Sequence, residues 1–112
     1  MTRRLSVEAI CRSIEALLPG GCPLIEQVAR SLHVTPRTLQ RLLDDEGVSF
    51  SQLVDACRCQ TACDSLEYTR DSVREIAAFL GYRDVGSFSR AFRSWTGKAP
   101  HAYRNYLGQP ES

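Results

Sequence analysis

The feature that most constrains the fold of this chain is a segment that occurs twice. Residues 28–43 read VARSLHVTPRTLQRLL, and residues 76–92 read IAAFLGYRDVGSFSRAF. The copies align with one extra residue in the second turn, so that Thr35 matches Asp84 and Arg41 matches Arg90. Each copy combines a short helical pattern, a turn, a residue suited to begin a helix and an apolar pair four positions apart. The repeat predicts two helix-turn-helix units.

Helical periodicity continues outside the repeat, and no useful stretch alternates as a strand would. Pro36 suits a first helical position because its missing N–H would be unpaired there, and Gly81 and Gly97 suit the left-handed residue that often ends a helix. We therefore expect an all-α fold with about seven helices, in which a long linker helix joins two helix-turn-helix (homeodomain-like) subdomains. The expected helices cover residues 6–18, 24–32, 35–46, 49–67, 71–80 and 84–96, and a last one begins at Pro100.

The predicted domain organisation follows from these helices. It comprises an N-terminal helix and connector (1–22), a first helix-turn-helix subdomain (23–48), a linker helix (49–67), a second subdomain (71–107) and a flexible tail (108–112). The second helix of each unit, over 35–46 and 84–96, is the expected recognition helix. The aromatic residues Phe79, Tyr82 and Trp95 are expected in the core of the second subdomain.

Composition narrows the class of protein. The net charge of +1, with 43% hydrophobic and 24% charged residues, is ordinary for a globular domain. No apolar run approaches the roughly 20 residues of a membrane span, and the start MTRRLSVEAI lacks the apolar block of a secretory signal. We therefore expect a cytoplasmic protein with no membrane partner. No catalytic constellation and no phosphate-binding glycine loop is found, so that neither enzyme activity nor a cofactor is expected.

Cysteines offer one alternative function. The chain has five, Cys11, Cys22, Cys57, Cys59 and Cys63, and an odd number without a secretion signal indicates free thiols in a reducing compartment. A thiol-responsive or metal-responsive regulator that acts through the linker-helix cysteines is therefore one possible function. No CxxC pair and no nearby histidine accompanies them, so no metal site is expected.

The polar faces of the two recognition helices indicate double-stranded DNA as the partner. Arginine can donate twice to guanine and glutamine can pair with adenine in the major groove, while serine and threonine hydroxyls suit phosphates or bases. Helix N-termini also favour a phosphate. The expected DNA-binding residues are Thr35, Arg37, Thr38, Gln40, Arg41, Gly86, Ser87, Ser89, Arg90 and Arg93. Further backbone contacts are expected from Arg83, Lys98 and Arg104, whereas the acids Asp44, Asp45 and Glu46 should point out of the groove.

A helical protein-interaction module without DNA binding is a second alternative, because a fold does not determine a function. Such a surface should be richer in apolar anchors than this Arg, Gln, Thr and Ser face. The linker helix favours DNA as well. About 18 residues at roughly 1.5 Å each span about 27 Å, a length suited to hold two units over major grooves about 34 Å apart.

Taken together, these motifs resemble the DNA-binding domain of the AraC/XylS family of bacterial transcription regulators. The resemblance covers residues 23–107 and is carried by VARSLHVTPRTLQRLL, GVSFSQLV, REIAAFLGY, SFSRAFRSWTG and PHAYR. It implies two helix-turn-helix subdomains in adjacent major grooves and contact with RNA polymerase. By position, it implies base-reading roles for Arg37, Gln40, Arg41, Gly86, Ser87, Ser89 and Arg90.

Three departures from the family pattern carry expectations of their own. His33 stands where the family often has glycine, which predicts a left-handed non-glycine residue in the first turn. Val85 and Gly86 replace more polar residues, so the second unit should contribute more affinity than sequence discrimination. Most relatives carry a separate sensor or dimerisation domain, for which residues 1–22 are too short. We therefore favour a fragment of a longer regulator over a naturally short one.

Overall fold

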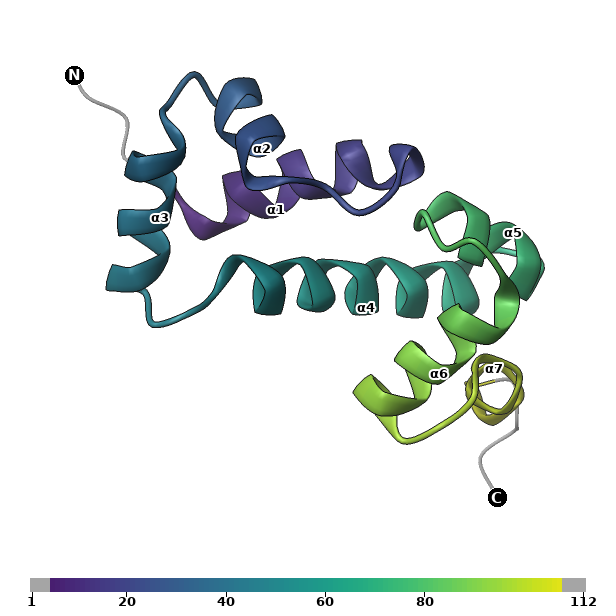
Figure 1. The fold of residues 1–112 in the computed structure, drawn as a ribbon. Coiled ribbons are helices and arrows are strands. Elements are labelled where there is room, and N and C mark those ends of the chain that lie inside the picture. Colours follow the sequence, from purple (N-terminus) through teal and green to yellow (C-terminus); the bar gives the residue numbers. More distant parts are fainter. Residues whose placement is uncertain (1–4, 108–112) are drawn as a thin grey trace. The chain divides into compact units, whose positions relative to one another are not determined.

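The structure is a computed structural model that describes residues 5–107, and all regular structure in this range is helical. Figure 1 shows the elements in chain order: α1 (Val7–Leu17), the 3-10 turn η1 (Leu18–Gly20), α2 (Ile25–Ser31), α3 (Pro36–Asp45), α4 (Phe50–Tyr68), α5 (Val73–Phe79), α6 (Val85–Thr96) and α7 (Pro100–Leu107). The predicted all-α class is confirmed, and the ends of the predicted helices differ by at most two residues, as expected where helices fray. The predicted tail at 108–112 and residues 1–4 lie outside the described range.

Two compact units make up the chain, and the division between them falls in α4 between Arg58 and Cys59. In the first unit, α2 packs against α1 and α3; in the second, α6 packs against α5 and α7. Each unit therefore contains the predicted short helix, turn and second helix (α2–α3 in blue, α5–α6 in green, Figure 1).

The cores of the two units use matching positions of the repeat. Small Ala29 and Ala77 are buried on the first helix of each unit, and large buried apolar residues follow on the second helix. The first core contains Ile10, Ile14, Leu18, Val28, Ala29, Leu39, Leu43, Leu53, Val54 and Cys57. The second contains Ala62, Leu66, Ile76, Ala77, Leu80, Phe88 and Phe92. The inward face of each recognition helix is thereby set by an apolar i, i+4 pair.

An aromatic cluster forms the centre of the second core. The Phe92 ring lies 5.8 Å from that of Phe88, 5.3 Å from Tyr103 and 6.4 Å from Trp95, measured between ring centroids. These spacings are those of favourable edge and tilted aromatic pairs. The prediction that Phe79 belongs to this core is wrong, because half of its surface is exposed at the end of α5.

Side-chain caps begin the helices, as the sequence predicts. Thr35 Oγ1 accepts from the Thr38 N–H at 3.1 Å, and Asp84 Oδ1 accepts from the Ser87 N–H at 2.7 Å. At α5, Ser72 accepts from the Glu75 N–H while the Glu75 carboxylate accepts from the Ser72 N–H, which is a capping box. The caps pair N–H groups that have no partner inside a helix. They therefore define where both recognition helices begin.

The turn of the first unit holds His33 at φ 58°, in the left-handed region predicted for it, where Gly81 stands at φ 84° in the second. A non-glycine residue in this region costs about 1–2 kcal/mol of strain, which glycine avoids. Glycine, however, loses about 0.5–1 kcal/mol more conformational entropy on folding, which offsets part of the stabilisation. Since His33 is exposed, we expect His33→Gly to raise the free energy of unfolding by about 0.5–1 kcal/mol. Urea denaturation followed by circular dichroism measures it. Gly81→Ala should lower stability, and the same sign for both variants would contradict this explanation.

Candidate nucleic-acid interface

The first recognition helix, α3, presents its predicted residues to solvent. Leu39 and Leu43 are fully buried, which turns the opposite side of the helix outward. The predicted residues Thr35, Arg37, Thr38, Gln40 and Arg41 are all exposed. Arg37, Gln40 and Arg41 line one shallow hollow of about 310 Å³. The structure therefore brings the three predicted base-reading side chains of this helix together on one face.

Asp44 is a fourth lining residue of this hollow, so this acid lies beside the three predicted base-reading side chains. The expectation that it points out of the DNA groove stays a prediction. Gln40 Nε2 donates to Asp44 Oδ1 at 3.0 Å, four residues further along the helix. Side chains at this spacing are neighbours on a helix surface, so the sequence did contain a signal for the pair. An acid therefore belongs to the predicted DNA-binding face.

The second recognition helix, α6, exposes Gly86, Arg90 and Arg93 and half-buries Ser87 and Ser89. Arg90 Nη2 donates to Ser87 Oγ at 3.4 Å, so the guanidinium is turned back toward the helix N-terminus. A Cβ atom built on Gly86 would lie 3.4 Å from Arg90 Nη1 and 3.3 Å from an Asp84 carboxylate oxygen. A side chain at this position would therefore be tight against the Asp84 carboxylate and in ordinary contact with Arg90.

The cap of α6 also carries charge. Hydrogen bonds from the backbone N–H and the hydroxyl of Ser87, with smaller contributions from Arg90 and Arg83, hold the pKa of Asp84 below its usual value. The helix N-terminus is thus already neutralised by a carboxylate of the chain itself, which disfavours a phosphate at the same N–H groups. Phosphate contacts of this unit are better assigned to nearby arginines.

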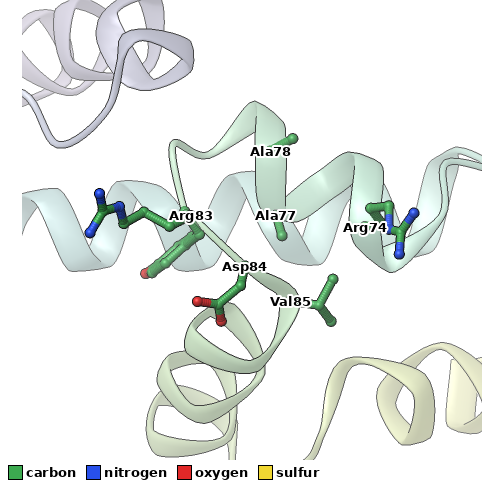
Figure 2. Close-up of a pocket in the computed structure, with 7 residues that line it drawn as sticks. Arg74, Ala77, Ala78, Arg83, Asp84 and Val85 are labelled. Atoms are coloured by element: carbon green, nitrogen blue, oxygen red, sulfur yellow. The ribbon is translucent and has the colours of Figure 1, made fainter.

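A hollow of about 400 Å³ lies at the turn between α5 and α6, and two arginines line it. Figure 2 shows Arg74 of α5 and Arg83 of the turn on opposite sides of Asp84 and Val85, which begin α6. The sequence points to Arg83 but not to Arg74, because only folding brings the start of α5 to this turn. The two guanidinium groups provide the positive charge beside the start of α6.

Two other predicted phosphate contacts have partners within the second unit. Arg104 Nε donates to the Leu66 carbonyl oxygen at 3.2 Å, and its Nη2 donates to the carbonyl oxygens of Ser65 and Thr69, each at 3.3 Å. These carbonyls lie at the C-terminal end of α4 or just beyond it, and that of Ser65 also accepts from the Thr69 N–H at 3.1 Å. The Lys98 ammonium lies 4.8 Å from the centre of the Tyr106 ring. Arg104 therefore caps the C-terminal end of α4, and its expected contact with the DNA backbone stays a prediction.

Two of the linker-helix thiols, those of Cys57 and Cys59, have raised pKa values. Burial, followed by the neighbouring Cys11, raises the pKa of Cys57, and burial together with Cys63 raises that of Cys59 to about 11. Such thiols stay protonated at neutral pH, whereas the thiolate is the reactive and metal-binding form. Among residues 5–107, no cluster of three or more His, Cys, Asp or Glu side chains is suited to a metal ion. The same range contains no helix with the length and apolar character to cross a membrane.

Comparisons with known proteins agree with this geometry. The model of a helix-turn-helix domain family matches residues 28–106. The ornithine utilization regulator of Pseudomonas aeruginosa is 44% identical over 86 residues, which cover 77% of this chain and 25% of that protein. The chain spans 25–31% of the length of the curated relatives that it matches.

Solved structures show the same fold. A DNA-binding transcriptional dual regulator from Escherichia coli K-12 has a TM-score of 0.83 and 26% identity, over 97% of this chain and 100% of that chain. The transcriptional regulator CdpR from Pseudomonas aeruginosa has a TM-score of 0.67 and 41% identity, over 86% of this chain and 31% of that chain. The chain therefore belongs to the AraC-type helix-turn-helix family of DNA-binding transcription regulators.

Proposed function

We propose that this chain binds double-stranded DNA in a sequence-specific manner and thereby regulates transcription initiation. The observation that carries the proposal is the pair of capped helices α3 and α6, each of which turns arginine and hydrogen-bonding side chains outward from an apolar core. The N-terminal residues of such a helix contact base edges in the major groove. Since the DNA-binding solved neighbour from Escherichia coli K-12 covers almost the whole chain, it supports the same role.

The proposed contacts differ between the two helices. On α3, Arg37, Gln40 and Arg41 read bases, while the hydroxyls of Thr35 and Thr38 contact phosphates. On α6, Arg90 reads a base and Gly86 permits close approach of the backbone. Ser87 and Ser89 contribute hydroxyls, and Arg93 contacts a phosphate. The second helix offers fewer base-reading groups, so we assign it more affinity than discrimination.

The arrangement on DNA is also a proposal. We propose that residues 23–48 and 71–107 act as two reading subdomains, that residues 49–67 link them, and that they occupy adjacent major grooves. Helix α4 has 19 residues and is thus about 28 Å long, a scale comparable with the roughly 34 Å between neighbouring grooves.

Partners other than DNA follow from the family. We propose that the chain acts in the bacterial cytoplasm, contacts RNA polymerase and has no enzymatic activity. Since it spans about a quarter of the ornithine utilization regulator, we propose that it works with a sensor or dimerisation domain of a longer regulator. The thiols of Cys57 and Cys59 are assigned a structural role, because burial keeps them protonated.

Selection of bound sites from random duplex DNA tests the proposal. Two conserved blocks about one helical turn apart, each protected in a footprint, are the expected result. A single block would overturn the assignment of two reading helices. The absence of any enriched site, together with capture of a protein by the α3 and α6 faces, would favour the protein-interaction module.

Arg41→Ala tests one base contact. If Arg41 donates to a guanine, the variant should lose about 1–3 kcal/mol of binding free energy on the selected site, with relaxed preference at that base pair. Titration of labelled duplexes measures it, with the exposed Arg12→Ala on α1 as the matched control. Equal weakening on every sequence would identify Arg41 as a phosphate contact instead.

A further inference from the structure

The pair formed by Gln40 and Asp44 on α3 has features that a helix-surface contact does not require. Both side chains are exposed, and both line the hollow that Arg37 and Arg41 also line. Gln40 Nε2 donates to Asp44 Oδ1 at 3.0 Å, a well-formed hydrogen bond to a charged acceptor. A carboxylate thus stands among the groups that are proposed to face DNA.

This hydrogen bond determines which way the Gln40 amide faces. An ionised carboxylate only accepts, so the amide must turn Nε2 and not Oε1 toward Asp44. Of the two N–H groups on Nε2, the one directed away from Oε1 keeps the two negative oxygens apart. Donation of that N–H leaves Oε1 and the remaining N–H side by side as an acceptor and a donor. This is the pattern that pairs with adenine N6 and N7 in the major groove.

An acid on a DNA-binding face weakens binding in general, because it repels phosphates. Affinity therefore gives no reason for Asp44 to lie here, whereas orientation of Gln40 does. We propose that Asp44 is a positioning residue that holds the Gln40 amide in the orientation selective for adenine. This inference rests on the proposed function and names a specificity determinant of the same site.

The chain contains its own control for this proposal. On α4, Gln60 Nε2 donates to Asp64 Oδ1 at 2.9 Å with the same spacing in sequence. Both pairs therefore stabilise a helix surface in the same way. Only the pair on α3 lies on a recognition helix, so base preference separates positioning from a general helix-stabilising effect.

The experiment compares binding to four duplexes that differ only at the base pair contacted by Gln40, which is the position where Gln40→Ala loses preference. The wild-type chain should prefer adenine there by about fivefold or more. Asp44→Ala should reduce the preference below about twofold, while the three other duplexes are bound at least as tightly as before. Asp44→Asn should keep the preference, since its amide oxygen still accepts. Asp64→Ala should keep both preference and affinity.

The outcomes separate this inference from the function on which it rests. Full adenine preference in Asp44→Ala, or equal loss of preference in Asp64→Ala, would overturn the positioning role. So would a wild-type chain that binds duplex DNA without any preference that depends on Gln40. The absence of duplex binding by the wild-type chain would overturn the proposed function itself, and the inference with it.

Discussion

Replacement of Phe92 by alanine is expected to lower the free energy of unfolding of the second unit by about 3–5 kcal/mol. Phe92 is fully buried, and its ring contacts the rings of Phe88, Trp95 and Tyr103. The loss combines the transfer of a large apolar group to water with a cavity among rigid rings that cannot collapse into it. Because a domain is stable by only about 5–15 kcal/mol, the variant should unfold readily.

Trp95 provides the measurement, because it is the only tryptophan of the chain and lies beside Phe92. Its fluorescence in increasing urea reports unfolding of the second unit directly. Phe79→Ala is the matched control: the same substitution at a half-exposed position should cost less than about 1 kcal/mol. A larger loss at Phe79 than at Phe92 would contradict the observed core.

The features that the sequence predicts correctly, helix caps and a left-handed turn, depend on residues that are close together in the chain. Caps are formed by residues three apart, so Thr35 and Asp84 could be identified without any knowledge of the fold. The left-handed turn at His33 is expected from the resemblance to a family that often has glycine there, and Gly81 is left-handed in the matching turn of the second unit. Both signals are short in range and depend on backbone geometry, which a few neighbouring residues determine.

Phe79 shows where residue type misleads. Helix geometry of about 100° per residue places Phe79 about 110° from the centre of the face formed by Ile76, Ala77 and Leu80. Those three residues are buried, whereas Phe79 is 50% exposed. Its position in the helix therefore predicts exposure correctly, and the aromatic side chain suggested the opposite. Periodicity is the better guide when the two disagree.

Arg104 and Asp44 show what sequence patterns leave out. Arg104 binds carbonyls that lie more than thirty residues earlier, as the sequence separations of 35–39 show, so that no local pattern reveals its partners. Asp44 has a local partner in Gln40, but the pair depends on the rotamers of two long side chains. The sequence therefore predicts which residues lie on the exposed face of the recognition helix. It does not predict which hydrogen bonds orient their side chains.

DNA binding by the chain is expected to depend steeply on salt. We assign one phosphate each to Arg93, Arg74 and Arg83, which are exposed on α6 or beside its start. Each neutralised phosphate adds about −0.9 to the slope of log K against log salt, so three contacts give about −2.7. Between about 50 and 200 mM salt, the binding constant should then fall by about 40-fold.

Single substitutions assign this salt dependence to residues. Arg93→Ala and Arg74→Ala should each reduce the slope by about 0.9, while base preference on the selected site stays unchanged. Arg12→Ala, at an exposed position on α1, removes the same charge outside the recognition helices and should leave the slope unchanged. Because counterion release depends on charges that meet phosphates and not on net charge, the slope distinguishes true contacts from general electrostatic attraction. A slope near zero for the wild-type chain would rule out a DNA interface built on these arginines.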